Sequence, residues 1–362
     1  MKKAERLILS RRRWPLVAGG IVVSLFCLIA ACADFLAPYD YRVQSRREPF
    51  APPATLHFFD AQGRWHARPF IYARRLVDPL RRNYEEDRER TYPLEFFVRG
   101  DHYKPFGLPA ANWHLFGIAG AANGDSPRIY LLGTDAFGRD RLSRLLVATR
   151  FSLLVGPIGT LLSALLGILI GCLAGYAGRA GNARLNWMDV VLMRSADAMM
   201  ALPDLVLILA VRAAFPLELP PARAALLLIC IFVALGWAEM ARLTRGLVME
   251  LREREFVMAA VSIGLSPVQV LWRHILPNSA RPLVVQTLLM LPAFLLSETA
   301  LSFLGVGLQE PEPSWGNLLA AAADVSLLER EHAWVMLTPA LAITLFVLGV
   351  RLLGAGLESR PE

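Results

Sequence analysis

The chain has 362 residues, of which 55% are hydrophobic and 19% are charged, and its formal net charge is +7. This composition is too apolar for an ordinary soluble domain of that length. The positive charge lies beside the apolar runs, as in membrane proteins, and gives no indication of nucleic-acid binding. We therefore predict an all-α membrane protein.

Six apolar runs predict six transmembrane helices, because about 20 helical residues cross a bilayer. The first two runs, 14–33 and 151–176, contain no charged residue. The other four are 195–211, 224–236 with its continuation, 283–308 and 333–350. Three prolines are expected to kink the spans that contain them: Pro203, Pro292 and Pro339.

Lys and Arg beside the spans predict their orientation. The N-terminus carries six basic residues within its first 13 positions and is expected in the cytoplasm. Alternation places the arginine-rich loop at 240–281 and the C-terminus on the same side. Four arginines lie on the predicted outer side and oppose this rule: Arg139, Arg141, Arg144 and Arg150. A long translocated segment tolerates positive charge, so we keep this topology.

The first span ends in a sequence, Ile29 to Cys32, that resembles a lipoprotein cleavage site. The alternative, an uncleaved first span, is favoured because the later spans need no export signal of this kind. The other cysteines lie within apolar runs without metal-ligand spacing, so no metal site is predicted: Cys27, Cys172 and Cys230.

Residues 37–130 are rich in aromatic, charged and proline residues and predict a small, mostly β insert outside the cytoplasm. Two hairpins are expected, one turning at 60–63 and one at 99–101, with a short charged helix at 74–90 between them. A loosely ordered loop is the alternative. The scattered histidines of the insert predict structural roles: His57, His66, His102 and His114.

The two motifs Gly-Thr-Asp at 133–135 and Gly-Arg-Asp at 138–140 predict a tight, hydrogen-bonded turn that leads into an amphipathic helix. A structural role is favoured there over a substrate contact. Ionisable residues inside the apolar runs are the candidate pore or pairing residues, because such groups need a partner or water in a membrane. They are Arg194, Asp197, Asp204 and Glu298, and the first two are expected to pair at i,i+3.

The loop before the fifth span predicts two short helices at a sharp angle. In the first, Phe256, Ala259, Ala260 and Ile263 fall on one helical face. Gly264 is expected to end this helix in the left-handed conformation. A second helix follows with a capping box and a terminal proline: Ser266, Pro267, Gln269 and Pro277. Such a bent pair would dock into a partner's groove or rest on the membrane surface.

These residues resemble the signature of permease subunits in binding-protein-dependent ABC importers, which is EAA, three residues, Gly, nine residues and I-x-L-P. Met258-Ala259-Ala260, Gly264 and His274-Ile275-Leu276-Pro277 stand in that register. Met258 replaces the family's Glu and His274 its Ile. Two more stretches, LLGTDAFGRDRLSRLL (131–146) and LSFLGVGLQEPEPSWGNLL (301–319), are similar to oligopeptide and dipeptide permeases of the C type. The enlarged first loop is similar to that of microcin C-type importers.

The resemblance covers about residues 128–356 and the first span, and it implies a MetI-like permease fold in a bacterial inner membrane. It divides the chain into 1–36 with the first span, the insert at 37–130 and a permease core at 131–358. The core includes a cytoplasmic coupling loop at 250–277, whose part at 255–277 would contact an ATPase. The implied coupling residues are Glu255, Met258, Ala259, Ala260, Gly264, His274, Leu276 and Pro277, with Glu255 standing in for the missing Glu.

The implied partners are a second homologous permease, two ATP-binding cassette subunits, an extracytoplasmic binding protein and a peptide. This chain is expected to be no enzyme and to bind no cofactor, with ATP and Mg on the ATPases. None of its three lysines, Lys2, Lys3 and Lys104, follows a Gly as a phosphate-binding loop requires. The alternatives are a secondary transporter or channel, which would work without ATP, and a membrane-anchored binding module.

Overall fold

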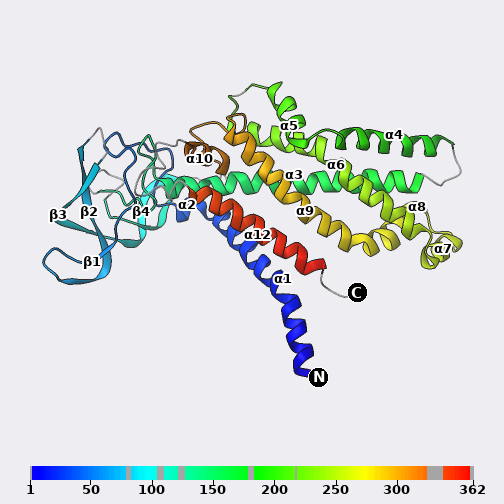
Figure 1. Ribbon diagram of the computed structural model, residues 1–362, viewed down its shortest axis with the longest axis horizontal. Coiled ribbons are helices and arrows are strands. Elements are labelled where there is room, and N and C mark those ends of the chain that lie inside the picture. Colours follow the sequence, from blue (N-terminus) through cyan, green and yellow to red (C-terminus); the bar gives the residue numbers. More distant parts are fainter. Residues whose placement is uncertain are drawn as a thin grey trace. The chain divides into compact units, whose positions relative to one another are not determined.

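The computed structural model describes residues 2–78, 83–103, 110–120, 127–177, 183–216, 218–323 and 337–358. The chain forms two compact units (Figure 1). The first, here called the helical unit, comprises Met1–Ser24, Leu153–Leu308 and Thr344–Glu362. The second, here called the mixed unit, comprises Leu25–Ser152 and Gln309–Ile343.

Within the described residues, five segments are long and apolar enough to cross a membrane: Trp14–Ala31, Arg141–Tyr176, Pro221–Arg252, Pro267–Phe303 and Thr338–Glu358. Their mean hydropathy ranges from 1.6 to 2.3. They belong to the helices α1 (Lys2–Ala31), α3 (Arg141–Ala177), α6 (Pro221–Arg252), α9 (Leu276–Phe303, continuing a shorter helix) and α12 (Thr338–Glu358). The protein is therefore an integral membrane protein.

The predicted span at 195–211 does not form one helix. It is divided between α4 (Ala183–Met200) and α5 (Asp204–Ala213). Pro203 stands between them with an extended backbone, φ −61° and ψ 122°, because proline has no N–H to continue the helical ladder. The expected kink at Pro203 is thus a complete break, and the prediction of six uninterrupted spans is not confirmed.

The other two prolines behave differently. Pro292 lies inside the continuous helix α9. Pro339 is the second residue of α12, and because residues 324–336 lie outside the described part of the chain, the kink expected at Pro339 stays a prediction. The residues 333–336 of the last predicted span lie outside the described part of the chain.

Helices α3 and α6 of the helical unit approach each other along a row of glycines on α3. A Cβ at Gly167 would lie 2.6 Å from that of Met240, and one at Gly171 would lie 2.5 Å from the carbonyl oxygen of Ala241. Gly175 is equally constrained by the next turn of α6. A spacing of four residues places these glycines on one helical face, as in small-residue contacts between membrane helices.

An ion pair joins α4 to α6. Asp189 is 6% exposed, and its two carboxylate oxygens accept from Nε and Nη2 of Arg245 at 2.6 and 2.7 Å. This two-pronged geometry is the strongest form of an Arg–carboxylate contact. Local sequence patterns do not indicate this pair, because the two residues are 56 positions apart.

Five strands between residues 57 and 117 form the small β region of the mixed unit. β1 (His57–Phe59), β2 (Trp65–Asp78) and β3 (Asn83–Pro93) make one antiparallel sheet, and β4 (Glu95–Tyr103) pairs with β5 (Ala111–Gly117) in a second. The hairpin at 60–63 is confirmed, since Phe59 lies opposite Trp65.

Two other predictions for this region are wrong. A charged helix is expected at 74–90, but its described residues, 74–78 and 83–90, lie in the paired strands β2 and β3. Arg74 stands opposite Glu86, and Arg75 opposite Glu85. Opposite charges facing each other across a sheet stabilise that pairing. The turn expected at 99–101 is also absent, because β4 runs through it. A Cβ at Gly100 would lie 2.6 Å from the ring of His114. The glycine therefore leaves space for the buried His114 ring on the neighbouring strand, and it does not form a turn.

The histidines have the structural roles expected where the structure gives contacts. His114 is 3% exposed, and its ring nitrogens lie 2.5 Å from the carbonyl oxygen of Ala37 and 3.0 Å from that of Asp101. His57 contacts Glu86, and His66 contacts Asp60, at 3.1 Å. No group of three or more potential metal ligands occurs within the described residues.

We expect Asp189→Asn to lower the free energy of unfolding by about 1–3 kcal/mol, because Arg245 would keep its charge without a compensating carboxylate in a half-buried position. Thermal unfolding of the purified chain in lipid nanodiscs would measure the change. Asp197→Asn is the matched control on the same helix, since that carboxylate is 42% exposed and its contact with Arg242 is 3.4 Å. An equal loss of unfolding free energy in the two variants would contradict a stabilising role for the ion pair between Asp189 and Arg245.

Candidate functional site

The bent segment between α6 and α9 is the first candidate site. It contains α7 (Glu255–Ser262), α8 (Pro267–Val270) and a π-helical turn, η3 (Leu271–Ile275). We call residues 255–275 the elbow. Figure 1 shows α7 and α8 beside one end of α6.

The predicted end of the first elbow helix is confirmed. Gly264 has a φ of +87°, the left-handed region that favours glycine. Its N–H donates to the carbonyl of Val261, and that of Leu265 donates to Ala260, which satisfies carbonyls left free at the helix end. The chain therefore turns sharply at this residue.

The predicted start of the second elbow helix is also confirmed. The Ser266 side chain accepts from the Gln269 N–H, and the Gln269 side chain accepts from the Ser266 N–H. Pro267 occupies the first turn of α8. The prediction that Pro277 ends this helix is wrong, because α8 continues through η3 into α9. The wide π-helical turn precedes Pro277, where it relieves the clash between a proline ring and an earlier carbonyl.

The inner face of the elbow is firmly packed. Val257, Val270 and Ile275 are each 0% exposed and form one apolar cluster with Cys172 of α3 and Val248 of α6. Movement of the elbow is therefore coupled to the ends of these two long helices.

The outer face of the elbow is also apolar. Its exposed side chains include Phe256, Met258, Val261, Ile263, Val268 and Trp272, and Ile263 is 79% exposed. The prediction that Ala260 shares one face with Phe256, Ala259 and Ile263 is wrong in one respect. Ala260 is buried together with Val257, whereas the other three residues are exposed. Because α7 is apolar almost all round, burying one face leaves an exposed apolar surface, which is typical of a site that binds a protein or a membrane.

The remaining residues predicted for this site lie around the same elbow. Glu255 and Pro277 are exposed, and His274 and Leu276 are partly buried. Met258 lines a hollow of about 230 Å³ whose other lining residues are Gly175, Met249, Arg252 and Glu253.

The predicted pore or pairing residues have different environments. Arg194 and Asp197 pair as expected at 4.0 Å, and Arg242 of α6 approaches the same carboxylate. Glu298 is 0% exposed and accepts from the Ser302 hydroxyl at 2.9 Å. The Ser302 oxygen in turn accepts from the N–H of Leu308, beyond the end of α9. These contacts favour a structural role for Glu298.

A second candidate site lies in the mixed unit, where the predicted turn at 133–140 is confirmed. Gly133 and Gly138 have φ values of +69° and +71°, and Thr134 forms an isolated β-bridge with Asp140. The Asp135 carboxylate accepts from the N–H of Arg139 at 3.0 Å. Helix α3 begins directly after this turn.

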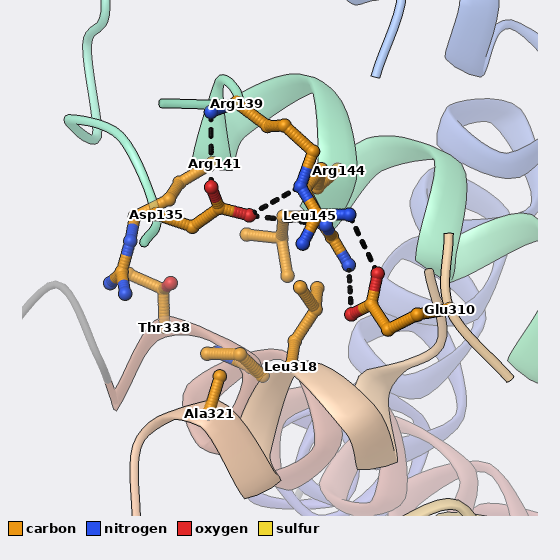
Figure 2. Close-up of a pocket in the computed structure, with 10 residues that line it drawn as sticks. Asp135, Arg139, Arg141, Arg144, Leu145, Glu310, Leu318, Ala321 and Thr338 are labelled. Atoms are coloured by element: carbon orange, nitrogen blue, oxygen red, sulfur yellow. Dashed lines mark hydrogen bonds and ion pairs between the residues drawn. The ribbon is translucent and has the colours of Figure 1, made fainter. Parts of the chain in front are cut away.

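The same turn organises an ion cluster of four side chains, here called the arginine cluster: Asp135, Arg139, Arg144 and Glu310 (Figure 2). Asp135 Oδ2 accepts from Arg139 Nε at 2.7 Å and from Arg144 Nη1 at 3.1 Å. Each oxygen of Glu310 accepts from one of the two arginines at 2.7 Å. Local sequence patterns do not indicate this cluster, because Glu310 is 166 positions from Arg144.

The segment after α9 is attached to the mixed unit at two more points. Glu312 accepts from the Tyr41 hydroxyl at 2.5 Å and from the Arg42 guanidinium. Trp315 begins α10 (Trp315–Ala321), is 0% exposed and donates from Nε1 to the Thr149 hydroxyl at 3.2 Å. Arginines on the predicted outer side of the membrane thus have partners within the mixed unit. One example is Arg150, whose guanidinium lies 2.9 Å from the carboxylate of Asp34.

Asp140 lies next to the arginine cluster in a fully buried position. Its Oδ2 accepts from the backbone and the hydroxyl of Ser143 at 2.9 and 2.6 Å, and its Oδ1 has no hydrogen-bond partner in the part of the chain that the structure describes. Burial raises the pKa of Asp140 to about 6, because the charged form loses its hydration.

Comparison with known proteins identifies the family. Residues 167–362 match the family described as binding-protein-dependent transport system inner membrane component, and residues 11–53 match the N-terminal TM domain of oligopeptide transport permease C. The class defined by the long apolar helices is thus a membrane permease. The chain belongs to the binding-protein-dependent transport family. Residues 54–166, which contain the β region, lie between the two matched ranges.

Two relatives illustrate the similarity. The chain is 37% identical over 226 residues to a putative peptide permease protein of Brucella suis. The aligned segment covers 62% of this chain and 70% of the relative. The chain is 36% identical over 226 residues to the dipeptide transport system permease protein DppC of Alkalihalophilus pseudofirmus, with 62% and 69% covered.

We expect the pH dependence of stability to differ between the wild type and Asp140→Asn. Between about pH 4 and pH 6, the folded chain holds a proton on Asp140 that the unfolded chain has released. This group therefore contributes less stability as the pH rises through that window, and its contribution is constant above it. Asn keeps the acceptor for Ser143 and removes the titration.

Melting temperatures of both proteins, measured in nanodiscs from pH 4 to pH 8, would test this expectation. The difference between the wild type and the variant should favour the wild type most at the acidic end. A difference that is the same at every pH would show that Asp140 does not titrate in this range.

Proposed function

We propose that this chain is a permease subunit of an ATP-driven importer of oligopeptides or dipeptides in a bacterial inner membrane. It would form half of the translocation pore with a second homologous permease. Two ATPase subunits would bind ATP and Mg in the cytoplasm, where both termini of this chain would lie, and a binding protein would deliver the peptide from outside. The family, and relatives described as peptide and dipeptide permeases, support this proposal.

The observation that carries the proposal is the two-sided elbow. Its inner face is locked to α3 and α6 by the cluster around Val257 and Val270, while its outer face leaves large apolar side chains exposed. A partner that covers the outer face gains the free energy of burying this surface. A movement of the bound partner would displace the elbow, and the packed inner face would transmit this displacement to α3 and α6, because a packed core resists compression.

Met258 gives the contact a particular chemistry. The family signature has Glu at this position, whereas here an apolar side chain is 51% exposed beside the hollow of about 230 Å³. We infer that the ATPase presents an apolar group at this point. Glu255, exposed in the first turn of α7, would supply the acidic contact that Met258 does not.

We expect Ile263→Asp to weaken the association of the ATPase subunits by at least about tenfold, because a charge would replace the most exposed apolar side chain of the elbow. Folding should be unaffected, since the residue is 79% exposed. ATPase that copurifies with the permease in mild detergent would be quantified, together with ATP-driven peptide uptake into proteoliposomes.

Val77→Asp is the matched control, because Val77 is 51% exposed on β2 and far from the elbow in sequence. It should leave copurification of the ATPase unchanged. Normal copurification and uptake in Ile263→Asp would count against docking at the elbow. Uptake that persists without ATP while an ion gradient is maintained would instead indicate a secondary transporter.

A further inference from the structure

The arginine cluster contains two guanidinium groups that are buried and fixed independently of Glu310. Arg139 and Arg144 are 5% and 1% exposed at their side chains, and Asp135 holds both. The Nε of Arg144 has no hydrogen-bond partner among the described residues. This buried N–H leaves Arg144 with capacity for one further hydrogen-bond acceptor.

The charges around the cavity of this cluster do not balance. Arg141 also lines it, and its Nε donates to the carbonyl of Thr134 at 3.1 Å rather than to a carboxylate. Three guanidinium groups therefore face two carboxylates, those of Asp135 and Glu310. An anion that enters this cavity is attracted by the excess positive charge.

Glu310 is the replaceable member of the cluster. Its side chain is 49% exposed, in contrast to the buried arginines, and it lies in the turn after α9 rather than within a helix. Hydration of the released carboxylate is nearly free of cost, because half of its surface already contacts water, whereas the two buried arginines need another carboxylate in its place. Each of its oxygens binds one arginine, which is the arrangement that any free carboxylate would adopt there (Figure 2).

The size of the cavity limits which groups can enter it. Its volume is about 40 Å³, whereas a site for one water needs roughly 10–15 Å³. The cavity therefore holds one small group and has no room for a second carboxylate beside Glu310. Its remaining lining residues are Leu145, Leu318, Ala321, Thr338 and Pro339, and all of them except Thr338 are apolar. This combination suits a carboxylate attached to a small apolar side chain.

We propose that the arginine cluster is a binding site for the C-terminal carboxylate of a peptide, which displaces Glu310 and takes over its two contacts. The inference rests on the proposed function for the choice of a peptide as the source of the carboxylate. Exchange of one carboxylate for another leaves the charge of the cluster unchanged, so binding requires no unpaired buried charge. Displacement of Glu310 also removes one contact between Arg144 of α3 and the turn that precedes α10.

The test uses trialanine and its C-terminal amide as probes, with the full-length chain in zwitterionic lipid nanodiscs and isothermal titration calorimetry as the measurement. Glu310→Gln removes the internal competitor and keeps its shape. We expect this variant to bind trialanine at least tenfold more tightly than the wild type, and neither protein to gain affinity for the amide. In the double variant Glu310→Gln with Arg144→Gln, the gain should be lost.

Glu312→Gln is the matched control, since this carboxylate is two residues away and contacts Tyr41 and Arg42 instead. It should bind trialanine like the wild type. The proposal is overturned if Glu310→Gln shows no gain, if the acid and the amide bind equally, or if Glu312→Gln gives the same gain. A melting temperature for Glu310→Gln within a few degrees of the wild type would verify that the variant is folded.

This test is separate from that of the transport function, because it uses the isolated permease without ATP or ATPase. Binding of trialanine by Glu310→Gln together with absent ATP-driven uptake would retain the carboxylate site and reject the importer. Uptake that depends on ATP together with no difference between the acid and the amide would retain the importer and reject the site.

Discussion

The close contact between α3 and α6 is the constraint on which the helical unit depends. Gly167, Gly171 and Gly175 bring the two backbones together, since any side chain there would meet the facing helix. The same two helices provide Cys172 and Val248, against which the inner face of the elbow packs. The geometry of the proposed docking surface therefore follows from a row of residues that have no side chain.

Charged groups are distributed according to the same need for partners. Asp189 of α4 pairs with Arg245 of α6. Within the mixed unit, Arg139 pairs with Asp135 and Arg150 pairs with Asp34. In an apolar chain such groups are retained only where an opposite charge or a backbone carbonyl is within reach. Glu310 is the half-exposed exception within its cluster, and this difference in exposure is the basis for the proposed carboxylate exchange.

Three local predictions are confirmed because the interacting residues are close in sequence. The capping box of Ser266, the left-handed Gly264 and the turn leading to Arg141 each involve neighbours within a few positions. The predicted charged helix between Arg74 and Arg90 failed because its charges are compensated across two strands. The register that brings Arg74 opposite Glu86 is a property of the sheet.

The class of the protein, most of its apolar helices and the existence of the elbow are predictable from consecutive residues, because hydropathy and helix ends are local properties. Three features are visible only in the folded chain: the buried face of the elbow, the separation of two helices at Pro203, and the contacts of Glu310 with Arg139 and Arg144. These features depend on contacts between residues far apart in the chain, and a linear pattern does not specify which distant partners will meet.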